Sequence, residues 1–130
     1  MALSIISCCF LCAVVNPYSF NCSSLKLLSS NFASANLKVA YYSLHMWEEP
    51  VISGDAGSGT IFFTYCNLRC CYCQNYEISQ LGKGNEITIE ELASTFIELK
   101  NKGANNINLV TGFAFVPQII EALNLAKQKG

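Results

Sequence analysis

The second half of the chain alternates between strand-like and helix-like segments, and this alternation restricts the fold more than any other feature of the sequence. Residues 60–65 are β-branched or aromatic and predict a buried strand, with a glycine-rich turn at residues 54–59 before it. Residues 106–111 predict a second strand, and a helix is expected after each. Strands joined through a helix are normally parallel, with a right-handed crossover. The pattern therefore predicts an α/β fold of about two βα units.

Both predicted helices have recognisable ends. Thr88 and Glu91 have the spacing of a capping box, which predicts that the first helix begins there, and Gly103 suits the left-handed position after its end. Pro117 suits the first turn of the second helix, and Gly130 is expected to follow its last turn. Apolar residues recur with the helical period in both segments: Ile89, Leu92, Ala93, Phe96, Leu99, Val116, Ile119, Ile120 and Leu123. Each helix should therefore cover the sheet with one face.

Length and charge limit the classes of protein to which the chain can belong. Its 130 residues allow one small domain and are too few for a complete large barrel. Because the sequence ends where a third strand should begin, we expect a truncated domain. The net charge is −1 and Lys and Arg form no cluster, so the basic surface of a nucleic-acid-binding protein is not expected.

The first third of the chain differs in composition from the rest. All nine acidic residues lie from Glu48 onward, whereas the preceding residues are rich in Ser and Cys. This shift predicts a poorly ordered leader at residues 1–45 and a domain at residues 46–130. The apolar start lacks the basic region of a signal peptide and is too short to span a bilayer, and transit peptides are Arg-rich whereas the first Arg here is Arg69. Neither secretion nor a membrane is expected.

The eight cysteines fall into two groups. Cys8, Cys9, Cys12 and Cys22 lie in the leader, and Cys66, Cys70, Cys71 and Cys73 follow the first predicted strand directly. Near neighbours have poor geometry for disulfides, so the second group predicts metal binding. Its pattern Cys-x3-Cys-x2-Cys places Cys66, Cys70 and Cys73 in a loop that we expect to be too short for their thiolates to point apart, while Cys71 is expected to point elsewhere. Iron–sulfur clusters ordinarily take four thiolates, so three leave one iron open.

This cysteine pattern, with an aromatic residue before the third cysteine, resembles the signature of the radical S-adenosylmethionine superfamily. The resemblance extends over residues 37–130 and is closest to uncharacterised radical proteins related to pyruvate formate-lyase activating enzyme. The stretches that carry it are Trp47-Glu48-Glu49-Pro50, Ile52-Ser53-Gly54, Gly57-Ser58-Gly59-Thr60-Ile61-Phe62-Phe63, Cys66-Asn67-Leu68-Arg69-Cys70 and Cys73-Gln74-Asn75-Tyr76-Glu77-Ile78-Ser79.

The resemblance implies the first part of a (β/α) TIM-like barrel and an enzyme with a [4Fe–4S] cluster on Cys66, Cys70 and Cys73. The open iron would bind S-adenosylmethionine, with Tyr72 and Gly112 near the cofactor. Reductive cleavage would give a 5′-deoxyadenosyl radical that abstracts hydrogen, with a backbone glycine of a partner enzyme as one candidate substrate. The resemblance also implies a cytoplasmic setting and a reductant such as flavodoxin or ferredoxin.

The sequence also departs from this family and leaves other interpretations open. Cys9 and Cys12 lack the family's continuation, which leaves open whether the leader cysteines bind metal, and Gly112-Phe113-Ala114 replaces a Pro-Thr-His-like stretch. One alternative is a zinc module that uses Cys71 or His45 as a fourth ligand. A ferredoxin-like carrier is less favoured because its cysteine spacing is absent. An inert fragment without radical chemistry is the third alternative.

Overall fold

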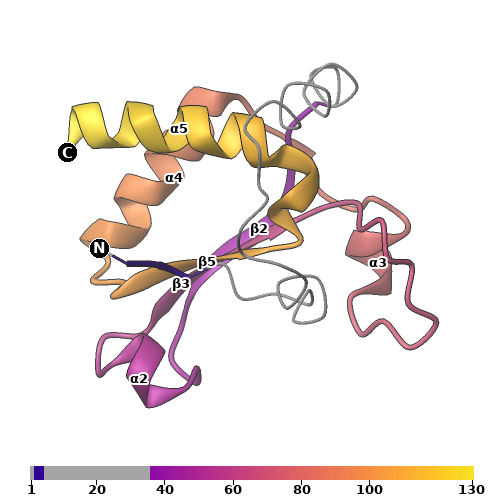
Figure 1. Cartoon of the computed structure of the whole chain (residues 1–130), viewed down its shortest axis with the longest axis horizontal. Helices are drawn as coiled ribbons and strands as arrows, with labels where there is room; N and C mark the ends of the chain where they lie inside the picture. The colour runs from indigo at the N-terminus through magenta and orange to yellow at the C-terminus, as the bar shows by residue number, and fades with distance from the viewer. Residues whose placement is uncertain (1, 5–35) are drawn as a thin grey trace, which may run out of the picture.

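The strand that precedes the cysteine group lies at the centre of a mixed sheet (Figure 1). The computed structural model describes residues 2–4 and 36–130. In it, β3 (Ser58–Phe63) pairs in parallel with β5 (Asn106–Val110) and antiparallel with β2 (Lys38–His45). β1 (Ala2–Ser4) lies beside β5 and β4 (Asn85–Glu86) beside β2, which gives the order β1-β5-β3-β2-β4. The α/β class and the parallel pair predicted from the sequence are confirmed, whereas the continuation into a barrel stays a prediction.

The first of the two predicted strands, β3, begins and ends slightly earlier than expected. β3 begins at Ser58, so Gly59 belongs to the strand and not to the preceding turn. A Cβ atom at Gly59 would lie 3.1 Å from Leu99 Cδ1 and 3.3 Å from Ala104 Cβ, which shows how closely the end of the following helix packs on the strand. The strand ends at Phe63, and Tyr65 has a φ of 61°, outside the range of a strand.

The expected leader at residues 1–45 is wrong at its C-terminal end. Residues 38–45 form β2, and Val39 is buried in the core. The composition changes near residue 47, but strand pairing depends on contacts with residues far along the chain, here β3, which composition does not report. Of the rest of the expected leader, Ala2–Ser4 form β1 and residues 36–37 are described, whereas Cys8, Cys9, Cys12 and Cys22 lie outside the described residues.

The two long helices begin where the sequence predicts. In α4 (Ile89–Asn101), the Glu91 amide donates to Thr88 Oγ1 at 3.2 Å and the Thr88 amide donates to Glu91 Oε2 at 2.7 Å, which completes the capping box. Gly103 follows the helix with a φ of 91°. Pro117 lies in the first turn of α5 (Val116–Lys129).

Both long helices lie on the same side of the sheet (Figure 1), and the apolar core fills the space between the helices and the sheet. The buried core residues are Leu37, Val39, Ile61, Phe63, Leu92, Ala93, Phe96, Leu99, Ala104, Ile107, Leu109, Phe115, Ile119 and Ala122. Most of the predicted helical apolar positions are among them, whereas Ile120 is half exposed.

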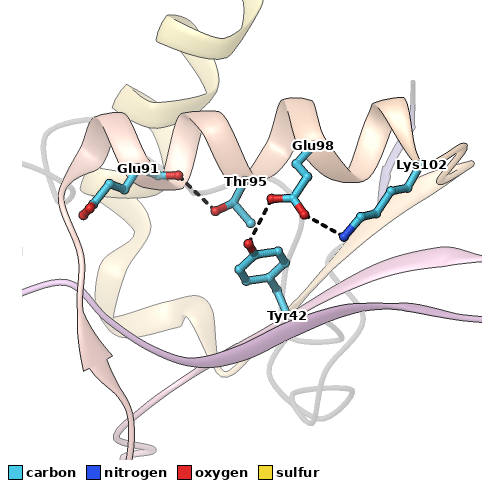
Figure 2. A network of polar contacts seen from close by, with 5 residues as sticks. All are labelled: Tyr42, Glu91, Thr95, Glu98 and Lys102. Carbon is cyan, nitrogen blue, oxygen red and sulfur yellow. Dashed lines mark hydrogen bonds and ion pairs between the residues drawn. The ribbon is translucent and has the colours of Figure 1, made fainter.

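A polar network joins β2 to α4 at the surface (Figure 2). The Tyr42 hydroxyl donates to Glu98 Oε2 at 2.9 Å, and Lys102 Nζ donates to the other carboxylate oxygen at 2.6 Å. These hydrogen bonds, first that from Lys102 and then that from Tyr42, hold the pKa of Glu98 below its ordinary value. The network therefore fastens β2, which sequence analysis had assigned to the leader, to the helical layer.

The sheet face away from the long helices carries a chain of buried polar side chains. Ser58 Oγ donates to Asn106 Oδ1 at 2.7 Å, and Asn106 Nδ2 donates to Asn108 Oδ1 at 2.9 Å. Asn108 Nδ2 then donates to Glu48 Oε1 at 3.2 Å. Since Glu48 precedes α2 (Pro50–Ser53), this chain holds the connection between β2 and β3 against the sheet.

Candidate cluster site

A closed loop at the carboxyl end of β3 carries all four described cysteines. The Tyr65 amide donates to Ile78 O at 3.2 Å and the Cys66 amide donates to Ser79 O at 2.9 Å, so residues 65–66 and 78–79 are paired at the base of the loop. The short helix α3 (Tyr76–Ser79) forms the returning arm and lies at the end of the sheet away from α2 (Figure 1). The two ends of the loop are therefore hydrogen-bonded to each other directly after β3.

The three predicted ligands share this loop but differ from Cys71 in exposure. Cys66, Cys70 and Cys73 are partly buried, whereas Cys71 is exposed, and all four are free thiols. A hydrogen bond of 3.2 Å from the Cys73 amide to Cys70 O closes a turn between the second and third predicted ligands. Within residues 2–4 and 36–130, however, no three His, Cys, Asp or Glu side chains converge enough to hold a metal ion.

In a [4Fe–4S] cluster each cysteine binds a different iron, so the three sulfurs need not converge on one ion, and the expectation that they point toward one another stays a prediction. The donor set still fits an iron–sulfur cluster in its chemistry, because thiolates are the ligands of such clusters and three of them leave one iron open. Two of the three are joined by the Cys70–Cys73 turn, and Cys66 stands at the anchored base. The assignment of Cys66, Cys70 and Cys73 as ligands stays a prediction.

Cys73 contacts a serine that the sequence analysis did not single out. Its sulfur lies 3.2 Å from Ser79 Oγ, and Ser79 is only 3% exposed. The same serine accepts the Cys66 amide through its backbone carbonyl. Ser79 thus contacts the first and third predicted ligands, one through its backbone and one through its side chain.

A cavity of about 470 Å³ lies beside Cys66, between the loop and the turn after β5. Its lining consists of Tyr65, Cys66, Asn67, Arg69, Ser79, Gln80, Ala114 and Phe115. Gln80 Nε2 is buried there without a hydrogen-bond partner among the described residues. Arg69 is the only charged residue of the lining and has a left-handed φ of 49°. The lining therefore includes one residue with a cationic, donor-only side chain, Arg69, next to a predicted cluster ligand.

The turn after β5 is fixed against β3. Thr111 Oγ1 donates to Phe63 O at 2.6 Å, which joins the carboxyl ends of the two parallel strands. In the following 3₁₀ helix η1 (Gly112–Phe115), Gly112 is buried, and a Cβ atom there would lie 3.0 Å from Ile119 Cδ1 and 3.3 Å from Phe63 Cε2. This close packing gives Gly112 a structural reason to be glycine. Ala114 and Phe115, not Gly112, line the cavity, so a contact of Gly112 with the cofactor stays a prediction.

The other residues singled out from the sequence lie away from this cavity. Tyr72 is 84% exposed in the middle of the loop and does not contribute to the lining, so its place beside the cofactor stays a prediction. His45 pairs with Ser58 at the opposite end of β3, about 17 Å from the strand's carboxyl end. The alternative zinc site with His45 as fourth ligand is therefore wrong.

The family of the chain follows from comparison with known proteins. The model of the Radical SAM superfamily matches residues 60–130, more than half of the chain, from β3 through the cysteine loop to the end of α5. The chain therefore belongs to the radical SAM superfamily, and the resemblance predicted from the sequence is confirmed. The mixed α/β fold described above fits part of a radical SAM domain.

Two curated relatives match part of the chain. An uncharacterized protein of Methanocaldococcus jannaschii is 37% identical over 86 residues, which cover 58% of this chain and 24% of that protein. A pyruvate formate-lyase-activating enzyme of Clostridium pasteurianum is 28% identical over 85 residues, which cover 62% of this chain and 36% of that enzyme. The chain thus spans well under half the length of both relatives. No solved structure matches it.

None of the helices in the described parts of the chain combines the length and the apolar character needed to cross a membrane.

Proposed function

We propose that this chain is the cluster-binding part of a radical S-adenosylmethionine enzyme, with Cys66, Cys70 and Cys73 as the ligands of a [4Fe–4S] cluster. The observation that carries the proposal is the placement of these three thiols in a loop anchored at the carboxyl end of a parallel strand, next to a cavity. The carboxyl ends of parallel strands are where α/β folds bind ligands. When bound, the cluster would supply the electron that cleaves S-adenosylmethionine to methionine and a 5′-deoxyadenosyl radical.

The cavity beside Cys66 is the binding site that we propose for S-adenosylmethionine. Its volume of about 470 Å³ falls within the usual range for small-molecule sites, about 300–1,000 Å³. Arg69 belongs to its lining, and S-adenosylmethionine carries a carboxylate, which is a group that accepts hydrogen bonds from a guanidinium. Phe115 and Ala114 form an apolar wall that would exclude water from one side of the bound cofactor.

For the substrate, we propose a backbone glycine of a partner enzyme, and for the electron donor a flavodoxin or ferredoxin. The support for the substrate is that one relative is named an activating enzyme of pyruvate formate-lyase. The free state of all four described cysteines fits a reducing, cytoplasmic setting.

Anaerobic reconstitution with iron and sulfide tests the ligand assignment. We expect the wild-type chain to bind about four iron atoms and four sulfides per chain, as a [4Fe–4S] cluster requires. Cys66→Ala, Cys70→Ala and Cys73→Ala should each lose most of this iron, whereas the matched variant Cys71→Ala should retain it, because Cys71 is exposed. Iron that survives the loss of Cys70, or disappears in Cys71→Ala, would contradict the assignment.

A second experiment separates the enzyme from a plain metal module. After reduction with dithionite, the reconstituted chain should convert S-adenosylmethionine to 5′-deoxyadenosine, measured by liquid chromatography, and the Cys73→Ala variant should not. A cluster-loaded chain that leaves S-adenosylmethionine intact would support the alternative, a metal module without radical chemistry.

A further inference from the structure

Ser79 occupies a position from which its hydroxyl can act on the proposed cluster. It lies at the end of α3, on the returning arm of the cysteine loop, and is only 3% exposed. Its Oγ atom is 3.2 Å from Cys73 Sγ, within hydrogen-bond distance for a contact to sulfur. No other side-chain hydrogen bond of Ser79 is found among the described residues, so the hydroxyl is directed at the sulfur.

The backbone holds Ser79 in this position independently of the side-chain contact. The Ser79 amide donates to Asn75 O at 2.8 Å within α3, and the Ser79 carbonyl accepts from the Cys66 amide at 2.9 Å. Ser79 is therefore fixed between the base of the loop and the third predicted ligand. A hydroxyl that is oriented before the cluster binds loses little conformational freedom when it makes the hydrogen bond.

We propose that Ser79 is a positioning residue that donates a hydrogen bond to the ligating sulfur of Cys73 and raises the reduction potential of the cluster. This inference rests on the proposed function. In the free protein either atom can donate, but a sulfur bound to iron carries no proton, so only the Ser79 hydroxyl can donate then. Reduction adds one electron to the cluster, and a hydrogen bond to a sulfur stabilises the more negative state. Such hydrogen bonds are among the factors that set the potentials of iron–sulfur clusters.

The functional consequence concerns electron transfer. The electron that cleaves S-adenosylmethionine must first enter the cluster from a reductant of low potential, and a hydrogen bond from Ser79 would ease this step. The burial of Ser79 strengthens the effect, because a hydroxyl that is shielded from water has a low local dielectric constant around its hydrogen bond.

The test compares three variants after anaerobic reconstitution: Ser79→Ala, Ser79→Thr and Ser53→Ala. The alanine variant removes the hydroxyl at Ser79, and the threonine variant retains one. Ser53 is the matched control, because it is also a buried serine in a four-residue helix, 2% exposed, but its hydroxyl contacts only backbone carbonyls at the far end of the sheet. The readouts are the iron content, the midpoint potential from a dye-mediated titration and the electron paramagnetic resonance spectrum of the reduced cluster.

We expect Ser79→Ala to bind iron as the wild type does but to show a more negative midpoint potential and shifted g-values. Ser79→Thr should restore both toward the wild type, and Ser53→Ala should change neither. An unchanged potential and spectrum in an iron-loaded Ser79→Ala variant, or the same shift in Ser53→Ala, would overturn the role of Ser79 and leave the proposed function intact. Failure of the wild-type chain to bind a cluster would overturn the proposed function and this inference with it.

Discussion

Replacing Asn106 with alanine should destabilise the fold through the buried polar chain on the sheet face opposite the long helices. The Asn106 side chain is 3% exposed, accepts from Ser58 Oγ at 2.7 Å and donates to Asn108 Oδ1 at 2.9 Å. The alanine variant therefore leaves one donor and one acceptor unpaired in the interior. Each costs about 1–3 kcal/mol, so the free energy of unfolding should fall by about 2–6 kcal/mol.

This loss is a large part of the total, because domains of this size are stable by about 5–15 kcal/mol. The assay is urea denaturation followed by far-ultraviolet circular dichroism. Asn105→Ala is the matched control. The side-chain amide of Asn105 donates one hydrogen bond, to Ile52 O at 3.0 Å, and the side chain is exposed, so water can replace this bond in the variant. The free energy of unfolding should therefore fall by less than about 1 kcal/mol.

A double-mutant cycle isolates the contact itself. Asn106→Ala alone leaves the Ser58 hydroxyl unpaired, whereas the double variant Ser58→Ala/Asn106→Ala has no hydroxyl there. The double variant should therefore lose less free energy of unfolding than the two single variants added together, by about 0.5–3 kcal/mol. The reasoning would be refuted if Asn106→Ala were as stable as Asn105→Ala, or if the two single losses were simply additive.

Three further predictions concern other parts of the fold. Thr88→Ala removes the capping box of α4 and should lower the free energy of unfolding by about 0.5–2 kcal/mol in urea denaturation, while retention of wild-type stability would contradict the role of the cap. Thr111→Val keeps a β-branched residue at a φ of 58° and loses the hydrogen bond to Phe63 O, so it should cost about 1–2 kcal/mol, whereas Thr111→Gly relieves the backbone and should cost less; the reverse order would contradict this explanation. Because the folded pKa of Glu98 is lowered, its stabilising contribution is present above the unfolded carboxyl pKa of about 4.3 and is lost as the pH falls through the folded pKa. Between about pH 5 and about pH 2, where carboxyl groups titrate, the free energy of unfolding of Glu98→Gln should therefore fall less than that of the wild type. Identical acid unfolding curves for the two proteins would contradict a stabilising role for the Glu98 carboxylate.

The elements that depend on local chemistry could be predicted from the sequence. Thr88 and Glu91 form the expected capping box, and Pro117 and Gly103 lie where helix ends require them. The cysteine loop could be placed after a strand because a run of β-branched and aromatic residues precedes it. These signals act over three or four residues, so a single sequence contains them in full.

The features that depend on distant contacts could not be predicted. β2 was assigned to the leader because its acid-free composition matches the preceding residues, and only pairing with β3 places it in the sheet. The series of side-chain hydrogen bonds from Ser58 through Asn106 to Asn108 depends on the register between β3 and β5. Asparagine is normally depleted in strands, and an interior position for it becomes understandable only once its partners are known.

The sequence predicts ligands for the candidate site but gives no information on the residues that surround them. The spacing of Cys66, Cys70 and Cys73 predicts a shared ligand set, but the path of the loop determines that Ser79 contacts Cys73 and that Gln80 belongs to the lining of the cavity. A signal for Ser79 was present in the stretch that carries the family resemblance, where it ends the run after Cys73. Its role becomes visible only when the loop closes and brings residues 66 and 79 together.

The most direct test of the central claim is electron paramagnetic resonance of the reconstituted, dithionite-reduced chain with and without S-adenosylmethionine. A cluster held by three cysteine thiolates leaves one iron open, so a ligand that binds this iron changes its surroundings and hence the spectrum. The account predicts a [4Fe–4S]⁺ signal whose g-values shift when S-adenosylmethionine is added. A cluster signal that S-adenosylmethionine leaves unchanged, or the absence of any cluster, would contradict it.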